Sequence, residues 1–492
     1  MKQKIGMALG PVVAVGILLF TDLDPGHPLV TRCASVASLM AIWWITEALP
    51  IPATALIPVA LFPLFGIMKG SAVAGEYFNH IIFLFIGGFI VALAMEKWKL
   101  HERVALVTIL LIGSGARRII FGFMLATFVM SMWVSNTATT MMMTPMALAI
   151  ILQLRQVTPP DNREIVNKFS VALLLGIAYS ASIGGLATLI GTPPNLVLMR
   201  QMKIMFPDIP EIGFGQWMLF GLPLAVVLLL ICWWLLTKMF LGGKSTPAVD
   251  LQMFRKDIKE LGPMRYQEWV VFVSFIVMAA LWIFRKPLDF GIWTIPGWSA
   301  FLPEPGFVDD GVVAISIALA LFLIPARTNP GERIMDWRTA TNINWGIVLL
   351  FGGGFALAAG FVNSGLSEWM GTRLTGFAGA PEGVLVGAAS FLMMVLTELT
   401  SNTASTQMIL PVLGVFAEAN HLAPLLLMIP TTLSASCAFM LPVATPPNAI
   451  VFGTGELKMS DMMKAGVIMN FIGIALIVVF IFTLGAGVFA LE

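Results

Sequence analysis

The sequence predicts an all-α, polytopic membrane protein with eleven transmembrane helices and two re-entrant hairpins that form an inverted repeat. Of its 492 residues, 58% are hydrophobic and 11% are charged, whereas about 25% of the residues of a soluble domain are charged. Apolar runs such as residues 220–236 and 467–484 approach the roughly 20 residues that cross a bilayer as a helix. The polar triplet Ser-Asn-Thr occurs twice, each time between long apolar runs. A single soluble domain could not bury this much apolar surface.

Eleven apolar segments are long enough to be membrane crossings. The first follows Lys2 and Lys4 and resembles a signal peptide, but it continues into Asp22, Asp24 and Pro25 without a cleavage site of small residues. We therefore expect it to be the first spanning helix. The predicted crossings lie near residues 6–20, 33–49, 51–68, 79–97, 170–199, 216–240, 268–285, 311–326, 343–366, 423–455 and 465–490.

The basic residues predict the orientation of these crossings. Lysine and arginine concentrate in cytoplasmic loops, and an N-terminus inside the cell places most of the 28 Lys and Arg residues on that side. The exceptions are Arg32, Lys69, Arg200, Lys203, Arg285, Lys286 and Arg373. We therefore expect a cytoplasmic N-terminus and an extracytoplasmic C-terminus. Short loops and the lack of targeting extensions predict a multi-pass protein of the plasma (inner) membrane.

Two further apolar stretches, near residues 119–154 and 384–420, fit this orientation only if each enters and leaves the membrane on the same side. The Ser-Asn-Thr triplets fall near their middles, in SNTATTMMMTP (Ser135–Pro145) and SNTASTQMILP (Ser401–Pro411). The sequence therefore predicts two re-entrant hairpins with a triplet at each tip.

The two hairpins belong to an internal repeat. Ser401 follows Ser135 by 266 positions, and the sequence Gly-Gly-Phe recurs at the same offset at residues 87–89 and 353–355. A second pair of motifs follows each triplet, with SASIGGLATLIGTPPN at residues 180–195 and SASCAFMLPVATPPN at 434–448. Proline in a helix interior removes a backbone donor, so both helices should break at Thr-Pro-Pro-Asn.

The charge assignment gives the two halves opposite orientations, so we expect an inverted repeat. The predicted first half covers residues 1–240 and contains the repeat unit 79–240. A cytoplasmic loop, residues 241–267, connects it to the second half, 268–492, whose repeat unit is 343–492.

Irregular backbone at membrane depth survives only inside protein or beside a water-filled cavity, so the tips and broken helices should converge. Helix N-termini attract anions, and carbonyl, hydroxyl and amide oxygens suit a small hard cation such as sodium. Neither triplet nor either Thr-Pro-Pro-Asn segment contains Lys or Arg. A bound dianion would therefore need co-bound cations, and each ion would favour binding of the other.

Other functions have less support in the sequence. No phosphate-binding loop is present, and the three cysteines and four histidines are scattered. We therefore expect no enzyme activity, organic cofactor or nucleic-acid partner. A channel would need a continuous pore with weak sites. Glu47 and Glu398 are lone acids in apolar context, so a proton relay is a further alternative, and the Ser and Thr residues could serve only for helix packing.

The paired triplets, GTPPN and ATPPN, and TEALP at Thr46–Pro50 resemble the divalent anion/sodium symporter family, the INDY-type dicarboxylate transporters. The resemblance covers nearly the whole chain. It implies a homodimer whose protomers have a scaffold domain and a transport domain that moves like an elevator. It also implies sodium-coupled uptake of C4-dicarboxylates such as succinate, malate and fumarate, and two unaltered triplets favour these over citrate. A sodium-independent dicarboxylate exchanger and a citrate or sulfate transporter remain alternatives.

The family resemblance also implies the binding residues. The substrate carboxylates would contact Asn136, Thr137, Ser401, Asn402 and Thr403, with Thr192, Pro193, Thr445 and Pro446 lining the site. One sodium ion would be held by Ser131, Ser135, Asn136 and the carbonyl oxygen of Gly191. The second would be held by Thr397, Thr400, Asn402 and the carbonyl oxygen of Ala444.

Overall fold

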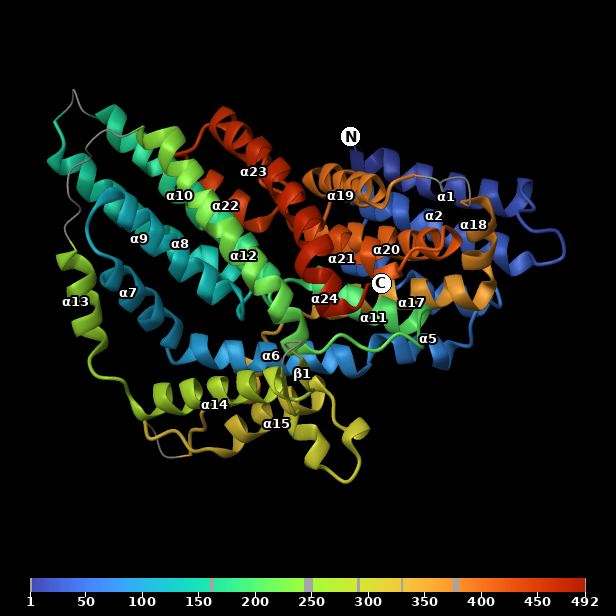
Figure 1. The fold of residues 1–492 in the computed structure, drawn as a ribbon, viewed down its shortest axis with the longest axis horizontal. Helices are drawn as coiled ribbons and strands as arrows, with labels where there is room; N and C mark the ends of the chain where they lie inside the picture. The colour runs from blue at the N-terminus through green and yellow to red at the C-terminus, as the bar shows by residue number, and fades with distance from the viewer. Residues whose placement is uncertain are drawn as a thin grey trace.

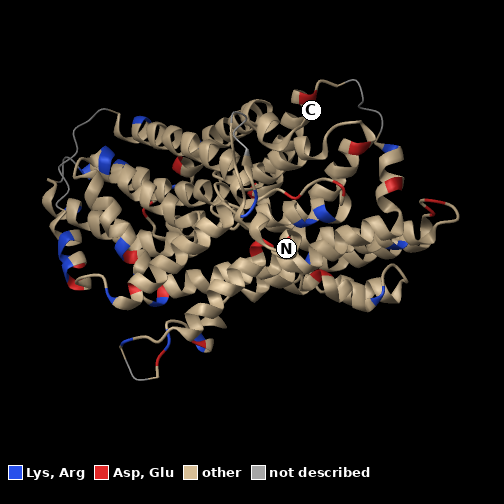
Figure 2. Cartoon of the chain, turned by 60° about the horizontal axis from the view of Figure 1, so that its bottom comes forward, with Lys and Arg blue, Asp and Glu red and all other residues tan. Residues whose placement is uncertain are grey.

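The computed structural model describes residues 2–159, 163–242, 251–289, 293–328, 331–374 and 380–491. Within these ranges the regular secondary structure is helical apart from one small hairpin, in which β1 (Leu288–Asp289) pairs antiparallel with β2 (Thr294–Ile295), and an isolated bridge between Pro325 and Arg333. Ten helices of the described chain are long and apolar enough to cross a membrane. Most charged residues lie in loops and at helix ends (Figure 2). The prediction of a polytopic α-helical membrane protein is therefore confirmed.

The helices follow one another in the order that Figure 1 shows. Up to the central loop they are α1 (Lys2–Phe20), α2 (Pro28–Thr46), α3 (Ile51–Thr54), α4 (Ile57–Leu64), α5 (Gly70–Tyr77), α6 (His80–Lys97), α7 (Leu100–Ile112), α8 (Ala116–Ser131), α9 (Asn136–Val157), α10 (Arg163–Leu186), α11 (Pro193–Met205), α12 (Phe214–Leu236) and the π-helical turn η2 (Thr237–Leu241).

After the central loop the chain repeats much of this order. Its elements are α13 (Gln252–Leu261), α14 (Tyr266–Ile283), the 3-10 turns η3 (Trp298–Phe301) and η4 (Pro305–Phe307), α15 (Asp310–Leu323), α16 (Trp337–Ala340), α17 (Trp345–Ser364), α18 (Leu366–Arg373), α19 (Glu382–Leu399), α20 (Asn402–Ala419), α21 (Pro424–Ala435), α22 (Pro446–Gly453), α23 (Met459–Phe480), the π-helical turn η6 (Ile481–Gly485) and α24 (Ala486–Phe489).

Two segments differ from the sequence prediction. The expected crossing at 51–68 is divided into α3 and α4, because Pro58 enters at the start of α4 and has no N–H to continue the preceding helix. The connecting segment 241–267 contains a helix, α13, which places Phe254 in the hydrophobic core and its charged residues outside. Residues 243–250 of that segment lie outside the described residues.

Both predicted helix breaks are present. α10 ends at Leu186 and α11 begins at Pro193, while α21 ends at Ala435 and α22 begins at Pro446. Proline is favourable at the first position of a helix, because the N–H that it lacks would have no intrahelical partner there. Each Thr-Pro-Pro-Asn sequence therefore starts a new half-helix.

The two Ser-Asn-Thr segments connect pairs of helices, α8 to α9 and α19 to α20. The α8–α9 pair packs against α10, and the α19–α20 pair packs against α21. The half-helices after the breaks cross over, since α11 packs against α20 and α22 packs against α9. Figure 1 shows α8, α9 and α10 together at one end of the molecule and α1, α2 and α18 at the other. This crossing brings both triplets and both breaks to the centre.

Glycines allow the helices around the central elements to approach their neighbours closely. A Cβ atom on Gly87 of α6 would lie 2.5 Å from Cβ of Ala314 on α15. On α17, a Cβ on Gly353 would lie 2.6 Å from Cβ of Ala55, between α3 and α4. Neither position has room for a side chain. These contacts place α6 against α15, and α17 against the junction of α3 and α4.

Candidate functional site

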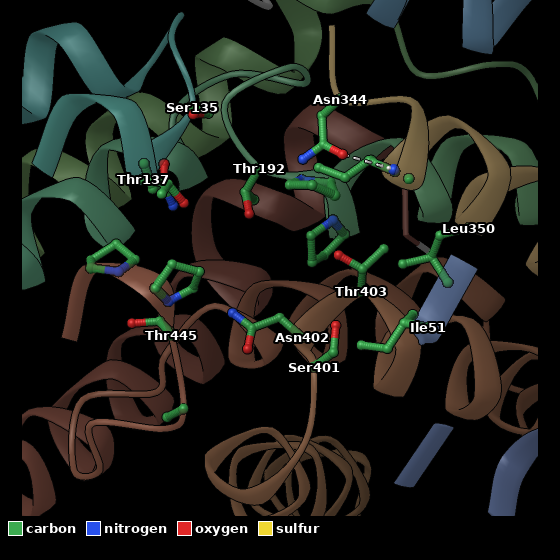
Figure 3. A pocket seen from close by; sticks show the side chains of 18 of the residues that line it. Ile51, Ser135, Thr137, Thr192, Asn344, Leu350, Ser401, Asn402, Thr403 and Thr445 are labelled. Carbon is green, nitrogen blue, oxygen red and sulfur yellow. Dashed lines mark hydrogen bonds between the residues drawn. The ribbon is translucent and has the colours of Figure 1, made fainter. Parts of the chain in front are cut away.

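A cavity of about 420 Å³ lies where the two triplets and the two helix breaks meet. All nine residues predicted to contact the substrate line it, namely Asn136, Thr137, Thr192, Pro193, Ser401, Asn402, Thr403, Thr445 and Pro446. Figure 3 shows Thr137, Thr192, Asn402 and Thr445 around one open space. Segments far apart in the sequence are therefore brought into a single site.

Four helices begin at the wall of this cavity. They are α9 at Asn136, α20 at Asn402, α11 at Pro193 and α22 at Pro446, and all four first residues line the cavity. Ser135 Oγ accepts a hydrogen bond from the N–H of Ala138 at 3.2 Å, which satisfies one free donor at the start of α9. Helix N-termini carry partial positive charge, and α9 and α20 also present N–H groups there, whereas α11 and α22 each begin with two prolines that have no N–H. The cavity therefore suits an anion, and among its described lining residues there is no lysine or arginine.

Oxygen atoms converge beside the first tip. Ser131 Oγ lies 2.5 Å from Asn136 Oδ1, and the carbonyl oxygens of Ala181 and Gly191 face the same end of the amide. Ser131 lies behind the cavity wall and is fully buried, whereas Asn136 and Gly191 line the cavity. A turned amide would bring Nδ2 to the same oxygens as a donor, and a cation would satisfy all four oxygens in the orientation observed. Hard cations prefer such oxygen ligands.

The second tip repeats this arrangement. Thr397 Oγ1 lies 2.6 Å from Asn402 Oδ1 and 2.7 Å from the carbonyl oxygen of Ala435. Thr397 and Ala435 are buried and hold the positions that Ser131 and Ala181 hold beside the first tip. Ala444 lines the cavity as Gly191 does. Within the described residues no group of His, Cys, Asp or Glu could hold a metal, so both cages consist of neutral oxygens.

Two predicted sodium ligands have other neighbours. Ser135 lines the cavity but serves as the N-cap of α9. Thr400 also lines the cavity, and its hydroxyl lies 2.5 Å from Ser405 Oγ and 2.7 Å from the carbonyl oxygen of Leu396. Thr400 is therefore already hydrogen bonded on the side of α20, whereas Thr397 faces the oxygen cage.

The asparagines of the two Thr-Pro-Pro-Asn motifs hold the broken helices in shape. Asn195 Nδ2 donates to the carbonyl oxygens of Gly185 and Thr188, at 3.1 and 2.7 Å. Asn448 Nδ2 donates to those of Ala438 and Leu441, both at 3.0 Å. Both asparagines are fully buried. They satisfy carbonyl groups that unwinding leaves without helical partners, so these asparagines maintain the break. Within each motif the threonine, Thr192 or Thr445, lines the cavity, whereas the asparagine does not.

Glu398 supports the second break. Its carboxylate accepts hydrogen bonds from the backbone N–H groups of Met440 and Leu441, at 2.9 and 3.1 Å, and from Asn470 Nδ2 at 2.7 Å. These donors lie in the unwound segment and on α23. The contacts give Glu398 a structural role, because a buried carboxylate satisfies backbone donors that the broken helix cannot pair.

A second set of helices closes the cavity from the other side. Figure 3 shows Ile51, Asn344 and Leu350 on the side of the space away from Thr137 and Thr445, with Ile51 and Leu350 beside Ser401 and Thr403. This wall is contributed by the α2–α3 turn, α6 and the start of α17, and its members are Glu47, Ile51, Pro52, Phe89, Asn344, Gly346, Ile347 and Leu350. Sequence reasoning missed most of these residues, since only Phe89, in the repeated Gly-Gly-Phe, and Glu47, in TEALP, belong to a motif. It did single out Glu47 as an acid in apolar context.

Comparison with known families identifies the chain. Residues 3–491 match the family described as the sodium:sulfate symporter transmembrane region. The chain belongs to this family. The divalent anion/sodium symporter resemblance drawn from the Ser-Asn-Thr and Thr-Pro-Pro-Asn motifs is therefore confirmed. Its relatives are transporters, as expected for a chain without enzyme activity.

Curated members of the symporter family match this chain over its whole length. The sodium-dependent dicarboxylate transporter SdcS of Staphylococcus saprophyticus is 42% identical over 493 residues, covering 100% of this chain and 93% of the relative. SdcS of Staphylococcus aureus is 42% identical over 489 residues, covering 98% of this chain and 91% of the relative.

Solved structures of other transporters share the fold. The YdaH transporter of Alcanivorax borkumensis aligns with a TM-score of 0.60 and 14% identity, covering 92% of this chain and 98% of that chain. MtrF of Neisseria gonorrhoeae aligns with a TM-score of 0.56 and 15% identity, covering 97% and 98%. At this identity the likeness concerns the fold alone.

Proposed function

We propose that this protein is a sodium-coupled symporter that imports C4-dicarboxylates such as succinate, malate and fumarate across the plasma (inner) membrane. The observation that carries the proposal is one cavity that combines four helix N-termini with two oxygen cages and has no cationic side chain among its described lining residues. The relatives named sodium-dependent dicarboxylate transporters support the same substrate class and coupling ion.

Sodium has an electrostatic role in this proposal. Helix N-termini contribute about half a unit charge each, and without Lys or Arg a dianion needs further positive charge nearby. One sodium ion would bind with Ser131, Ser135, Asn136 and the carbonyl of Gly191. The other would bind with Thr397, Thr400, Asn402 and the carbonyl of Ala444. Because each cation shares an asparagine with the substrate site, binding of ion and substrate would be mutually favourable.

The two carboxylates of the substrate would face the two tips. Asn136 and Thr137 would contact one carboxylate, and Ser401, Asn402 and Thr403 the other. Thr192, Pro193, Thr445 and Pro446 would complete the wall. If more sodium charge than substrate charge moves inward, transport is electrogenic, and each net charge gains about 2.3 kcal/mol from a potential of 100 mV.

For alternating access, we propose that the hairpins and broken helices form a transport domain, α8–α12 and α19–α23, that moves against α1–α6 and α14–α17. The hairpins would be re-entrant, the two repeat units inverted, the N-terminus cytoplasmic, the C-terminus extracytoplasmic and the protein a homodimer. The cavity wall supports this division, since one side comes from the triplet and proline motifs and the other from α2–α3, α6 and α17.

The test is succinate uptake into proteoliposomes with and without an inward sodium gradient, with citrate, sulfate and α-ketoglutarate as competitors. A symporter requires uptake that follows the sodium gradient and is inhibited by C4-dicarboxylates. Uptake that needs internal dicarboxylate and ignores sodium would make the protein an exchanger. If citrate or sulfate inhibits uptake most strongly, the protein is a citrate or sulfate transporter and the C4-dicarboxylate assignment is wrong.

A further inference from the structure

Glu47 is the one ionisable side chain among the described residues that line the central cavity. It follows α2, and its N–H donates to the carbonyl oxygen of Trp43 in a left-handed turn with φ of 52°. The chain then enters α3 at Ile51, which lines the cavity too. Glu47 is therefore held in the cavity wall formed by the α2–α3 turn and α17, in the same cavity as both triplets.

The carboxylate of Glu47 has no neutralising partner in the described chain. It is exposed, and no Lys, Arg or His of the described residues forms an ion pair with it. Two less exposed acids of the described chain are paired, Glu76 with Arg200 and Glu268 with Arg103. An unpaired negative charge in an anion site opposes the helix N-termini around it.

We propose that Glu47 sets the charge selectivity of the cavity, weakening binding of each anion in proportion to its negative charge. This inference rests on the proposed dicarboxylate function. Repulsion from Glu47 scales with ligand charge, so a tricarboxylate trianion is disfavoured more than a dicarboxylate dianion. The two sodium ions match the charge of a dianion, so a trianion brings one further negative charge on which the repulsion from Glu47 acts. The cavity therefore selects C4-dicarboxylates over citrate by charge.

Glu47 exerts this repulsion in the conformation described, in which the α2–α3 turn and both triplets line one cavity. With the predicted orientation, α2 ends on the cytoplasmic side. An imported substrate leaves the cavity on that side, so Glu47 repels the anion at the exit. Glu47 thereby also favours release into the cell. Its effect is electrostatic and passes through water in the cavity, so salt must weaken it.

The experiment measures equilibrium binding of succinate and of citrate to the purified full-length protein at saturating sodium and a pH at which citrate is a trianion. Glu47→Gln is expected to tighten succinate binding roughly three- to tenfold at low ionic strength, and citrate binding by a larger factor. Both gains should shrink when choline chloride is raised to about 1 M, where the screening length is about 3 Å.

Three variants separate charge from shape. Glu47→Asp keeps the charge and is expected to retain the preference for succinate. Glu47→Asn removes the charge, and because asparagine tolerates the left-handed conformation it replaces Glu47→Gln if that variant does not fold. Glu304→Gln makes the same change of net charge in an exposed loop outside the cavity and is expected to leave both affinities unchanged.

The inference is overturned if charge removal leaves both affinities unchanged, weakens them, or changes them equally and independently of salt. In those cases wild-type binding of succinate still supports the proposed function. If the wild-type protein binds neither anion in sodium, the proposed function fails and the selectivity inference fails with it.

Discussion

Asn136 Oδ1 faces Ser131 Oγ at 2.5 Å, with the carbonyl oxygens of Ala181 and Gly191 around the same point. The Ser131 hydroxyl supplies one hydrogen to these oxygens, and a turned amide or a cation would satisfy the others. The second half of the chain places Asn402, Thr397 and Ala435 in the same relationship. The internal repeat therefore preserves a cage of oxygens in addition to a sequence motif.

Replacing the cage amides is expected to stop transport. Asn136→Ala and Asn402→Ala each remove an oxygen that faces a cage and a side chain that lines the cavity. Sodium-driven succinate uptake should fall to background in proteoliposomes, while expression and elution volume stay normal. Asn363→Ala, at an exposed position on α17, is the matched control. Retained uptake in either cage variant would remove that tip from the mechanism.

Substitutions of Thr397 distinguish a role of its hydroxyl in sodium binding from a role of the side chain in packing. Thr397→Val keeps the shape and removes the oxygen that contacts Asn402 and the carbonyl of Ala435. We expect the sodium concentration for half-maximal succinate binding to rise at least about tenfold, or about 1.4 kcal/mol. Thr397→Ser keeps the oxygen, as Ser131 does in the first half, and should remain within about threefold of wild type. Equal sodium curves for Val and Ser would exclude this hydroxyl as a ligand.

Glu398 is expected to stabilise the second helix break without carrying protons. Glu398→Ala leaves the N–H groups of Met440 and Leu441 and the amide of Asn470 without their acceptor. A buried donor left unpaired costs about 1–3 kcal/mol, so the thermal unfolding temperature should fall clearly below that of the exposed control Glu382→Ala. Uptake by the surviving folded fraction should keep the wild-type dependence on a proton gradient. Loss of proton-dependent uptake without loss of stability would instead favour a proton relay.

The ion pair between Arg200 and Glu76 offers a test of domain movement. Arg200 on α11 donates to Glu76 on α5, with Nη2 and Oε2 2.7 Å apart. The proposed elevator moves α11 relative to α5. Cysteines at these two positions, joined by a short reversible thiol cross-linker, should arrest succinate uptake, and reduction should restore it. Each single cysteine treated in the same way is the control. Unimpaired uptake by the cross-linked protein would contradict movement between these helices.

The sequence by itself determined the membrane class, the Ser-Asn-Thr hairpin tips and both helix breaks. These features follow from local physics: apolar runs need a bilayer or a core, and proline at residues 193 and 446 cannot continue a preceding helix. All nine predicted substrate residues line one cavity. Both repeated motifs interrupt helices, and the irregular backbone at these interruptions must lie inside protein or beside a water-filled cavity.

Only the tertiary structure decided what completes the site. The carbonyls of Ala181 and Ala435 join the cages because α10 and α21 pack against the hairpins, and the repeated Ser-Ala-Ser sequence was the one signal that pointed there. The rest of the wall includes Asn344 and Leu350, at the start of α17, which belong to none of the motifs found in the sequence. The Thr400 hydroxyl forms a hydrogen bond with Ser405 Oγ, five residues further along the chain. Such contacts join segments far apart in the chain, and a one-dimensional pattern of polarity and proline does not encode which of them meet.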